Sequence, residues 1–276
     1  MNIKDLWESQ NEQDWRDALD GYWEIPSVKR NISLERSMCR IDAEDVKAFG
    51  PRECYEFLME EYFRWKFTEC GYLLRNQKRL WEYEKTNSLS DLASIKDSLF
   101  SFDLANACEG LARVERIRGL SWSAGSGLLA VLFPKWFGTV DQFVVKGLCE
   151  VESLPERQRV LAMIRIRKGK QVVEITSQEN AALLINIMRR KAAELNALFG
   201  RSESDPQRWT PRKIDMILFA LRPQKARSKG TLKLATAKQI RFRAIGNLST
   251  LKLSVMTKAQ VRYEAERLAR KWGRRA

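Results

Sequence analysis

The chain contains no histidine, and this limits the chemistry open to its side chains. Ser–His and Cys–His nucleophile pairs, histidine general bases and histidine-ligated metals are all excluded. The five cysteines are widely spaced with no Cys-x-x-Cys pair, so we expect no disulfide framework, zinc site or iron–sulfur cluster. Catalysis would therefore depend on carboxylates, lysine, tyrosine, hydroxyl groups or backbone dipoles, and we expect neither a metal nor a cofactor.

One stretch of the chain combines such groups at a spacing that could support catalysis. Two predicted helices meet at Arg118-Gly119-Leu120-Ser121, and the second, over 122–133, is rich in small residues. A tight glycine turn leaves backbone N–H groups free at a helix N-terminus, where they can bind a phosphate oxygen. Gly138-Thr139-Val140-Asp141 then leads into a predicted helix over 142–149. Asp141 could be the N-cap of this helix, a catalytic carboxylate, or both.

These two segments resemble the helix-hairpin-helix DNA glycosylases. The residues that carry the resemblance are Ile117-Arg118-Gly119-Leu120-Ser121-Trp122-Ser123-Ala124 and Val140-Asp141. The family has an apolar residue, then x-Gly-apolar-Gly, then a helix, and afterwards an aspartate in a Val-Asp context. Residues 177–200 and 209–221 also look like the C-terminal helices of oxoguanine-glycosylase-like bacterial proteins. The resemblance is best over 95–222 and is absent from the basic tail.

The resemblance implies a role for each part of the motif. Asp141 would be the catalytic carboxylate, because cleavage of an N-glycosidic bond builds positive charge on the sugar that a fixed carboxylate stabilises. The target base must first leave the stack, so the flanking phosphates must be held firmly. Gly119, Leu120 and Ser121 would form that phosphate clamp, and Arg118 and Ser123 beside it would also contact DNA.

Two departures from the family pattern affect this interpretation. Ser121 stands where the family has its second glycine. The branch that forms a Schiff base and nicks the strand has a lysine shortly after the hairpin, but residues 122–133 contain none, and Lys135 and Lys146 are out of register. We therefore expect a monofunctional glycosylase or a catalytically silent relative. Four aromatic residues could stack on an extruded base or belong to the core: Phe102, Trp122, Trp136 and Phe143.

The elements that would position these residues are predicted to be helical almost throughout. The fold class expected is mainly α, a helix-hairpin-helix glycosylase-like body with a basic C-terminal extension. Residues 164–175 could be a short hairpin around Gly169 or a loop. Caps and hydrophobic spacing predict helices over 1–21, 43–49, from Pro51, and over 72–85, 92–100, 104–117, 122–133, 142–149, 178–200 and 212–221.

The positive charge of the chain is concentrated in its last quarter. The net charge is +14, yet Arg201–Ala276 has 20 Lys and Arg against 5 Asp and Glu, and the first 200 residues have 29 against 30. This asymmetry is typical of a surface that faces phosphates, with a solubilising tail or an anionic membrane surface as alternatives. Beyond the glycine turn, the residues expected to contact DNA are Arg212, Lys213, Lys225, Arg227, Lys229, Arg241 and Arg243.

We divide the chain into an N-terminal helical region (1–94), a glycosylase-like core (95–222) and a basic extension (223–276). The extension should end in an amphipathic helix whose apolar stripe, Val261, Ala265, Leu268 and Trp272, could dock onto the body or a protein partner. The chain has no apolar run of the roughly 20 residues that span a membrane, and no signal-peptide pattern at residues 1–15. We expect a cytoplasmic protein without a membrane partner.

The leading functional interpretation is a protein that binds duplex DNA and hydrolyses the N-glycosidic bond of a damaged or modified base. The first alternative is a catalytically silent nucleic-acid-binding protein of a defence or regulatory complex. The second is an adaptor whose basic tail docks onto an acidic protein.

Overall fold

The computed structural model describes residues 1–167 and 169–222, and this part of the chain is mainly helical, as the sequence predicts. Residues 1–222, called the body below, belong to one compact unit. The basic extension and its predicted amphipathic helix lie outside the described residues. The boundary placed between residues 94 and 95 lies within helix α9 (Leu89–Ser98).

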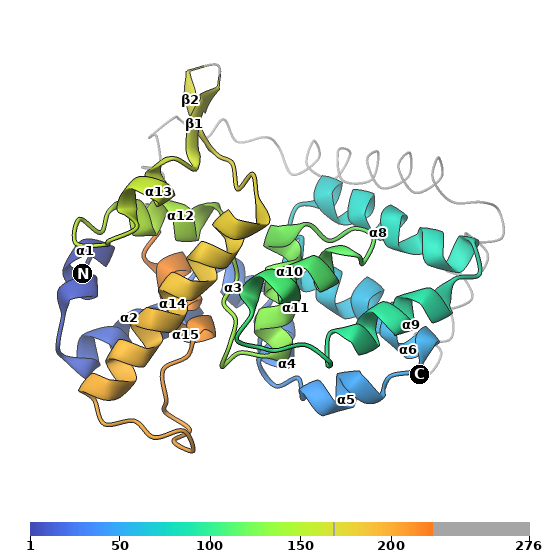
Figure 1. Cartoon of the computed structure of the whole chain (residues 1–276), viewed down its shortest axis with the longest axis horizontal. Helices are drawn as coiled ribbons and strands as arrows, with labels where there is room; N and C mark the ends of the chain where they lie inside the picture. The colour runs from blue at the N-terminus through green and yellow to red at the C-terminus, as the bar shows by residue number, and fades with distance from the viewer. Residues whose placement is uncertain (168, 223–276) are drawn as a thin grey trace, which may run out of the picture. The chain divides into compact units, whose positions relative to one another are not determined.

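The helices of the body pack in two groups (Figure 1). In the first group α15 packs on α2, α12 and α14, and α12 packs on α13. This group contains both ends of the body. Its helices are α1 (Ile3–Glu8), α2 (Glu12–Glu24), α12 (Gln142–Cys149), α13 (Arg157–Leu161), α14 (Gln178–Leu198) and α15 (Pro211–Ala220).

The second group is built from the middle of the body. In it α6 packs on α9, α8 on α7 and α9, and α10 on α11, and α10 also packs on α14 of the first group. Its helices are α4 (Ile32–Cys39), α5 (Ala43–Ala48), α6 (Pro51–Glu56), the π-helix η1 (Phe57–Tyr62), α7 (Phe63–Lys66), α8 (Cys70–Lys85), α9, α10 (Ala107–Glu115) and α11 (Trp122–Leu132). Helix α3 (Pro26–Arg30) leads from α2 to α4.

One large cluster of buried apolar side chains runs through both groups of helices. Its largest fully buried members include Trp15, Tyr62, Phe63, Phe137 and Trp209. The chain is therefore long enough to cover a continuous core, and the two groups are not separately folded layers. No helix of the described residues is both long and apolar enough to cross a lipid bilayer.

Side-chain caps explain where many helices begin. Asp42, Ser177 and Thr210 accept backbone hydrogen bonds as N-caps of α5, α14 and α15, and Pro211 occupies the first turn of α15. The helix expected over 1–21 is instead two helices. Asn11 starts the second by accepting the Gln13 N–H, so the chain breaks after Ser9. Residues 164–175, left open by the sequence, form an antiparallel hairpin of β1 (Ile164–Arg167) and β2 (Lys170–Val173).

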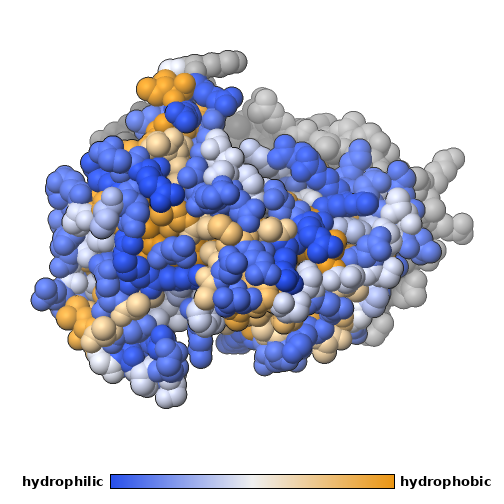
Figure 2. All heavy atoms as spheres, viewed as in Figure 1, coloured by the Kyte–Doolittle hydropathy of each residue, from blue (hydrophilic) through white to orange (hydrophobic). Residues whose placement is uncertain are grey.

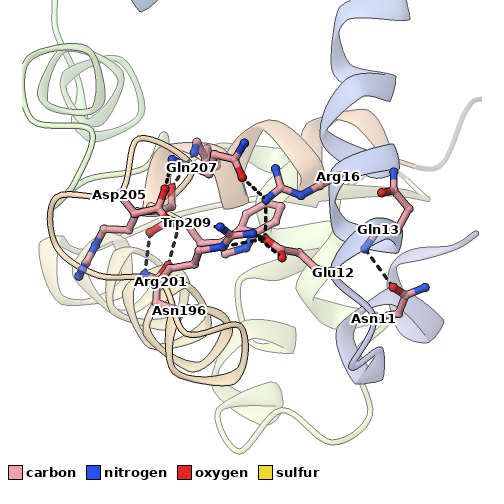
Figure 3. A network of polar contacts seen from close by, with 11 residues as sticks. Asn11, Glu12, Gln13, Arg16, Asn196, Arg201, Asp205, Gln207 and Trp209 are labelled. Carbon is pink, nitrogen blue, oxygen red and sulfur yellow. Dashed lines mark hydrogen bonds and ion pairs between the residues drawn. The ribbon is translucent and has the colours of Figure 1, made fainter.

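A polar network ties the start of α2 to the loop that follows α14 (Figure 3). Arg201 Nη2 donates to both carboxylate oxygens of Glu12, at 2.8 and 2.6 Å, and Arg201 Nη1 donates to Asp205 at 3.1 Å. Arg16 Nη2 donates to Glu12 at 2.6 Å and to the side-chain oxygen of Gln207 at 2.9 Å, and so joins α2 to the same loop. The hydrogen bond from Arg201 is the main reason that the pKa of Glu12 is lowered. The network fixes the loop that leads into α15, which carries two residues of the site below.

Candidate nucleic-acid interface and active site

The turn between α10 and α11 requires glycine at position 119. Gly119 has a φ of +97°, in the left-handed region. A Cβ at this position would lie 2.8 Å from the backbone oxygen of Asn76 and 3.2 Å from the ring of Phe63. The turn therefore combines the backbone conformation and the close approach that only glycine tolerates.

Helix α8 holds the glycine turn in place. The Tyr83 hydroxyl donates to the Arg116 carbonyl at 3.1 Å and accepts the Arg118 N–H at 3.3 Å. The Arg118 guanidinium lies 4.7 Å from the centre of the Tyr83 ring, and Leu120 is buried in the core. The turn is thus a fixed surface feature whose backbone position is set by the core.

The first turn of α11 presents backbone donors next to this glycine turn. Ser121 is the N-cap, but its side chain makes no capping hydrogen bond. Within the described residues the N–H groups of Trp122 and Ser123 have no hydrogen-bond acceptor. Helix N-termini carry a partial positive charge, so these donors and the helix dipole together favour an anion. Ser121 is exposed and Ser123 half-buried, so both lie at the surface. The side chain of Leu120, which was also predicted to contact DNA, is buried in the core and can contribute only its backbone.

Asp141 caps α12 with one carboxylate oxygen only. Its Oδ1 accepts the N–H groups of Phe143 at 2.7 Å and Val144 at 3.1 Å. Its Oδ2 has no partner among the described residues. The capping role and a catalytic role are therefore compatible, because the bonds that fix the carboxylate leave its second oxygen available.

The loop that carries Asp141 is held from three sides. The Thr139 N–H donates to Asp215 Oδ2 of α15 at 2.6 Å, and the Val140 N–H donates to Ser126 Oγ of α11 at 2.8 Å. A Cβ on Gly138 would lie 2.7 Å from the Pro211 backbone oxygen and 2.8 Å from the Met188 side chain. The position of Asp141 is thus set by buried contacts that come from both groups of helices.

Beneath this loop lies a buried charge cluster formed by Glu35, Arg212 and Asp215. Arg212 Nη1 donates to Asp215 at 2.7 Å, and Arg212 Nη2 donates to Glu35 at 3.2 Å. Glu35 also accepts the Tyr22 hydroxyl and the Trp65 indole N–H, each at 2.6 Å. Burial raises the pKa of Asp215 to about 6, while Arg212 and the Thr139 N–H act in the opposite direction. The cluster therefore sets two carboxyl groups against one guanidinium.

Lys66 is the group that sequence reasoning missed. It is half-buried, and its Nζ would lie 3.2 Å from a Cβ on Gly127, so the ammonium lies against α11 where that glycine leaves room. Gly127 is four residues after Ser123, on the same helix face. Loss of hydration lowers the pKa of Lys66, and the nearby carboxylates Asp141 and Asp215 partly restore it. Lys66 is the last residue of α7, the short helix that follows the π-helix η1, and only the three-dimensional fold brings it to α11.

The structure places the other predicted DNA contacts differently. Arg212 is 9% exposed, and its guanidinium is engaged inside the buried cluster, so it offers no free face to a phosphate in this structure. Lys213 is half-buried and donates to the Arg208 carbonyl at 2.6 Å. The predicted contacts of the tail lie outside the described residues: Lys225, Arg227, Lys229, Arg241 and Arg243.

Of the four aromatic residues considered for base stacking, only Phe143 belongs to the helix that Asp141 caps. Its ring packs edge-on against Phe219, with centroids 5.2 Å apart. Phe102 packs on Phe133 and Phe137, and the Trp122 indole N–H donates to Glu115 at 2.8 Å. Trp136 is 42% exposed.

Comparisons of the chain with protein-family models, with curated proteins and with solved structures found no match.

Proposed function

We propose that the body binds duplex DNA and hydrolyses the N-glycosidic bond of a damaged or modified base, with Asp141 as the catalytic carboxylate. The observation that carries this proposal is the fixed aspartate with one free oxygen. Asp141 is anchored through Oδ1, its loop is tied to α11 and α15, and its Oδ2 faces no protein donor. A carboxylate held in this way can stabilise positive charge on a sugar without reorganising during the reaction.

The glycine turn supports the DNA-binding part of the proposal. It presents the unpaired N–H groups of α11, which can hold a phosphate without regard to base sequence. Ser126 and Gly127 of the same helix contact the Asp141 loop and Lys66. One helix therefore connects the proposed phosphate clamp to the proposed catalytic groups.

The test is a base-excision assay on duplex oligonucleotides that carry oxoguanine, uracil or alkylated purines. Asp141→Asn is the informative variant because asparagine caps helices about as well as aspartate, so α12 should persist while the charge is lost. We expect the excision rate to fall on the order of 100-fold with DNA affinity retained. Asp42→Asn, the same change at the N-cap of α5, is the matched control and should leave excision unchanged.

If Asp141→Asn and the wild-type protein excise a base at the same rate, Asp141 is not the catalytic carboxylate. Tight DNA binding by a protein that excises none of these bases would favour the silent nucleic-acid-binding alternative. Neither binding nor excision would favour the adaptor.

A second candidate activity, cleavage of the strand at the abasic site, is favoured by Lys66. A desolvated amine is neutral at lower pH than a solvated one and can then act as a nucleophile. Lys66 Nζ would add to the C1′ aldehyde of the ring-opened sugar, and loss of water would give an imine. Removal of a C2′ proton would then break the C3′–O bond and release the phosphate, and hydrolysis would free the lysine.

Borohydride trapping on a preformed abasic-site duplex tests this activity without any need for base excision. Reduction of the imine should link the wild-type protein covalently to DNA, and Lys66→Gln should abolish that product. Lys135→Gln and Lys146→Gln are the controls and should be trapped normally. Equal trapping of Lys66→Gln and wild type would assign the amine to another residue, whereas no trapping of either would reject the strand-cleavage activity.

A further inference from the structure

The hairpin β1–β2 is attached to the body only at its base. Its strands pair in register as Ile164 with Val173, Arg165 with Val172, Ile166 with Gln171 and Arg167 with Lys170. Ile164 and Val173 are half-buried against the core, and the Glu174 N–H donates to the Met163 carbonyl at 2.8 Å. Beyond this first pair the residues are exposed, and the hairpin projects from the helices (Figure 1).

The outer part of the hairpin combines an apolar side chain with basic ones. Ile166 is 77% exposed, more than any other large apolar residue of the described chain. Because strand neighbours alternate, Arg165, Arg167 and Lys170 share the opposite face. Figure 2 shows apolar and hydrophilic atoms side by side on this projection.

The charge of the hairpin contrasts with that of the body. Four of the seven residues 164–170 are Arg or Lys, whereas the first 200 residues together have one more acidic than basic residue. Of the three basic hairpin residues that the structure describes, Arg167 pairs with the carboxylate of Glu174, and Arg165 and Lys170 have no carboxylate partner. A dense positive segment on a nearly neutral body is complementary to phosphate groups, and this complementarity favours a nucleic acid over an apolar protein surface.

The hairpin is also within reach of DNA bound at Asp141. Strand β2 packs on α12, the helix that Asp141 caps. Helix α12 has eight residues, a length of about 12 Å, and a four-residue strand adds about 13 Å. The outer residues therefore lie within about 25 Å of Asp141, roughly seven base pairs along a duplex.

We propose that the β1–β2 hairpin lies in the major groove of the duplex next to the excision site, with Arg165 and Lys170 on phosphates and Ile166 on base edges. A two-stranded ribbon fits the width of the major groove. The inference rests on the proposed DNA binding of the body and assigns a second DNA contact that the glycine turn does not provide. Ile166 would contact apolar groups on the base edges, such as the methyl group of thymine.

The first test measures the affinity of the full chain for a short undamaged duplex over a series of salt concentrations. Arg165→Gln/Lys170→Gln should reduce the slope of log K against log salt by about 2, because each lost phosphate contact removes about 0.9. The matched control, Arg36→Gln/Arg40→Gln, removes the same charge from exposed positions on and just after α4, far from the hairpin, and should leave the slope unchanged.

The second test probes the groove with dimethyl sulfate, which methylates guanine N7 in the major groove. The wild-type protein should protect guanines several base pairs from a lesion, and Ile166→Ser should expose them again. Leu198→Ala, a change at another exposed apolar residue, is the control and should keep the protection.

An unchanged salt slope in Arg165→Gln/Lys170→Gln, or guanine protection that survives Ile166→Ser, would overturn the hairpin proposal alone. A wild-type protein that binds no duplex would overturn the proposed function with it. Equal loss of slope in the α4 control would show a long-range charge effect and would also reject the contact.

Discussion

The loop that ends at Asp141 leads into α12, and the β1–β2 hairpin packs on the same helix. The loop is held along its length by buried contacts, whereas the hairpin is held only at its base. Thr139 and Val140 of the loop donate to buried side chains of α15 and α11, and a Cβ at Gly138 would meet the Pro211 backbone. The hairpin is fixed only at its first pair, and Ile166 is left exposed. A rigid loop can hold a catalytic charge in one position, whereas a projecting ribbon can contact a large ligand over a wider area.

The largest difference between the two regions should appear when their ion pairs are broken. Arg212→Met leaves Glu35 and Asp215 buried without their cation, so the free energy of unfolding should fall by about 3–5 kcal/mol. Arg167→Met breaks the exposed pair with Glu174 and should cost less than about 1 kcal/mol. Urea unfolding of both variants measures the two losses. Similar losses would show that the cluster below Asp141 is not a structural support.

A smaller contrast is expected between two glycines. Gly138→Ala forces its Cβ to within 2.7 Å of the Pro211 oxygen, so the loop must shift, at a cost of about 2–3 kcal/mol. A Cβ at position 169 would meet no atom within 4 Å, so Gly169→Ala should lower the free energy of unfolding by about 1 kcal/mol through the φ of +72° alone. Thermal unfolding compares the two variants. A larger loss for Gly169→Ala would mean that the hairpin, and not the loop, is the more constrained region.

The smallest effect is a shift in the pH dependence of imine trapping. The pKa of Lys66 is lowered from 10.5 by loss of hydration, and the amine is a nucleophile only when it is neutral. Trapping on abasic DNA should therefore rise with pH and reach half its maximum below pH 10.5. The measurement is the initial trapping rate at each pH. A midpoint at or above 10.5 would place the reacting lysine in water, and not at the desolvated position of Lys66 against α11.

Local features of this fold are predictable from the sequence because caps and turns are local. Asp42, Ser177, Thr210 and Asp141 do cap the helices expected after them, and the helix over 142–149 has the predicted bounds. The break after Ser9 was not predicted, since the apolar spacing of residues 1–21 also fits one helix. The sequence allows a hairpin or a loop over Ile164–Ile175, because apolar and polar residues alternate strictly only in its first four residues and the segment contains one glycine.

Contacts between distant segments account for what the sequence did not show. Arg212 has Lys213 beside it and Arg208 nearby, which favours a surface position. Its partner Glu35 is 177 residues away, so nothing in the local pattern indicates burial. Lys66 was missed for the same reason, because a lysine was sought on α11 itself, and the one found lies on α7. The buried cluster of Glu35, Arg212 and Asp215 forms only when α4 and α15 meet.

The most direct test of Asp141 compares two abasic-site analogues in the same duplex, a neutral tetrahydrofuran and a cationic pyrrolidine. The two make the same phosphate contacts and differ in the charge that a glycosidic transition state develops, so the target base need not be known. The account predicts that the wild-type protein and Asp42→Asn bind the pyrrolidine at least about 10-fold more tightly, and that Asp141→Asn binds both analogues equally. Equal affinity of the wild-type protein for the two analogues, or a preference that survives Asp141→Asn, would contradict it.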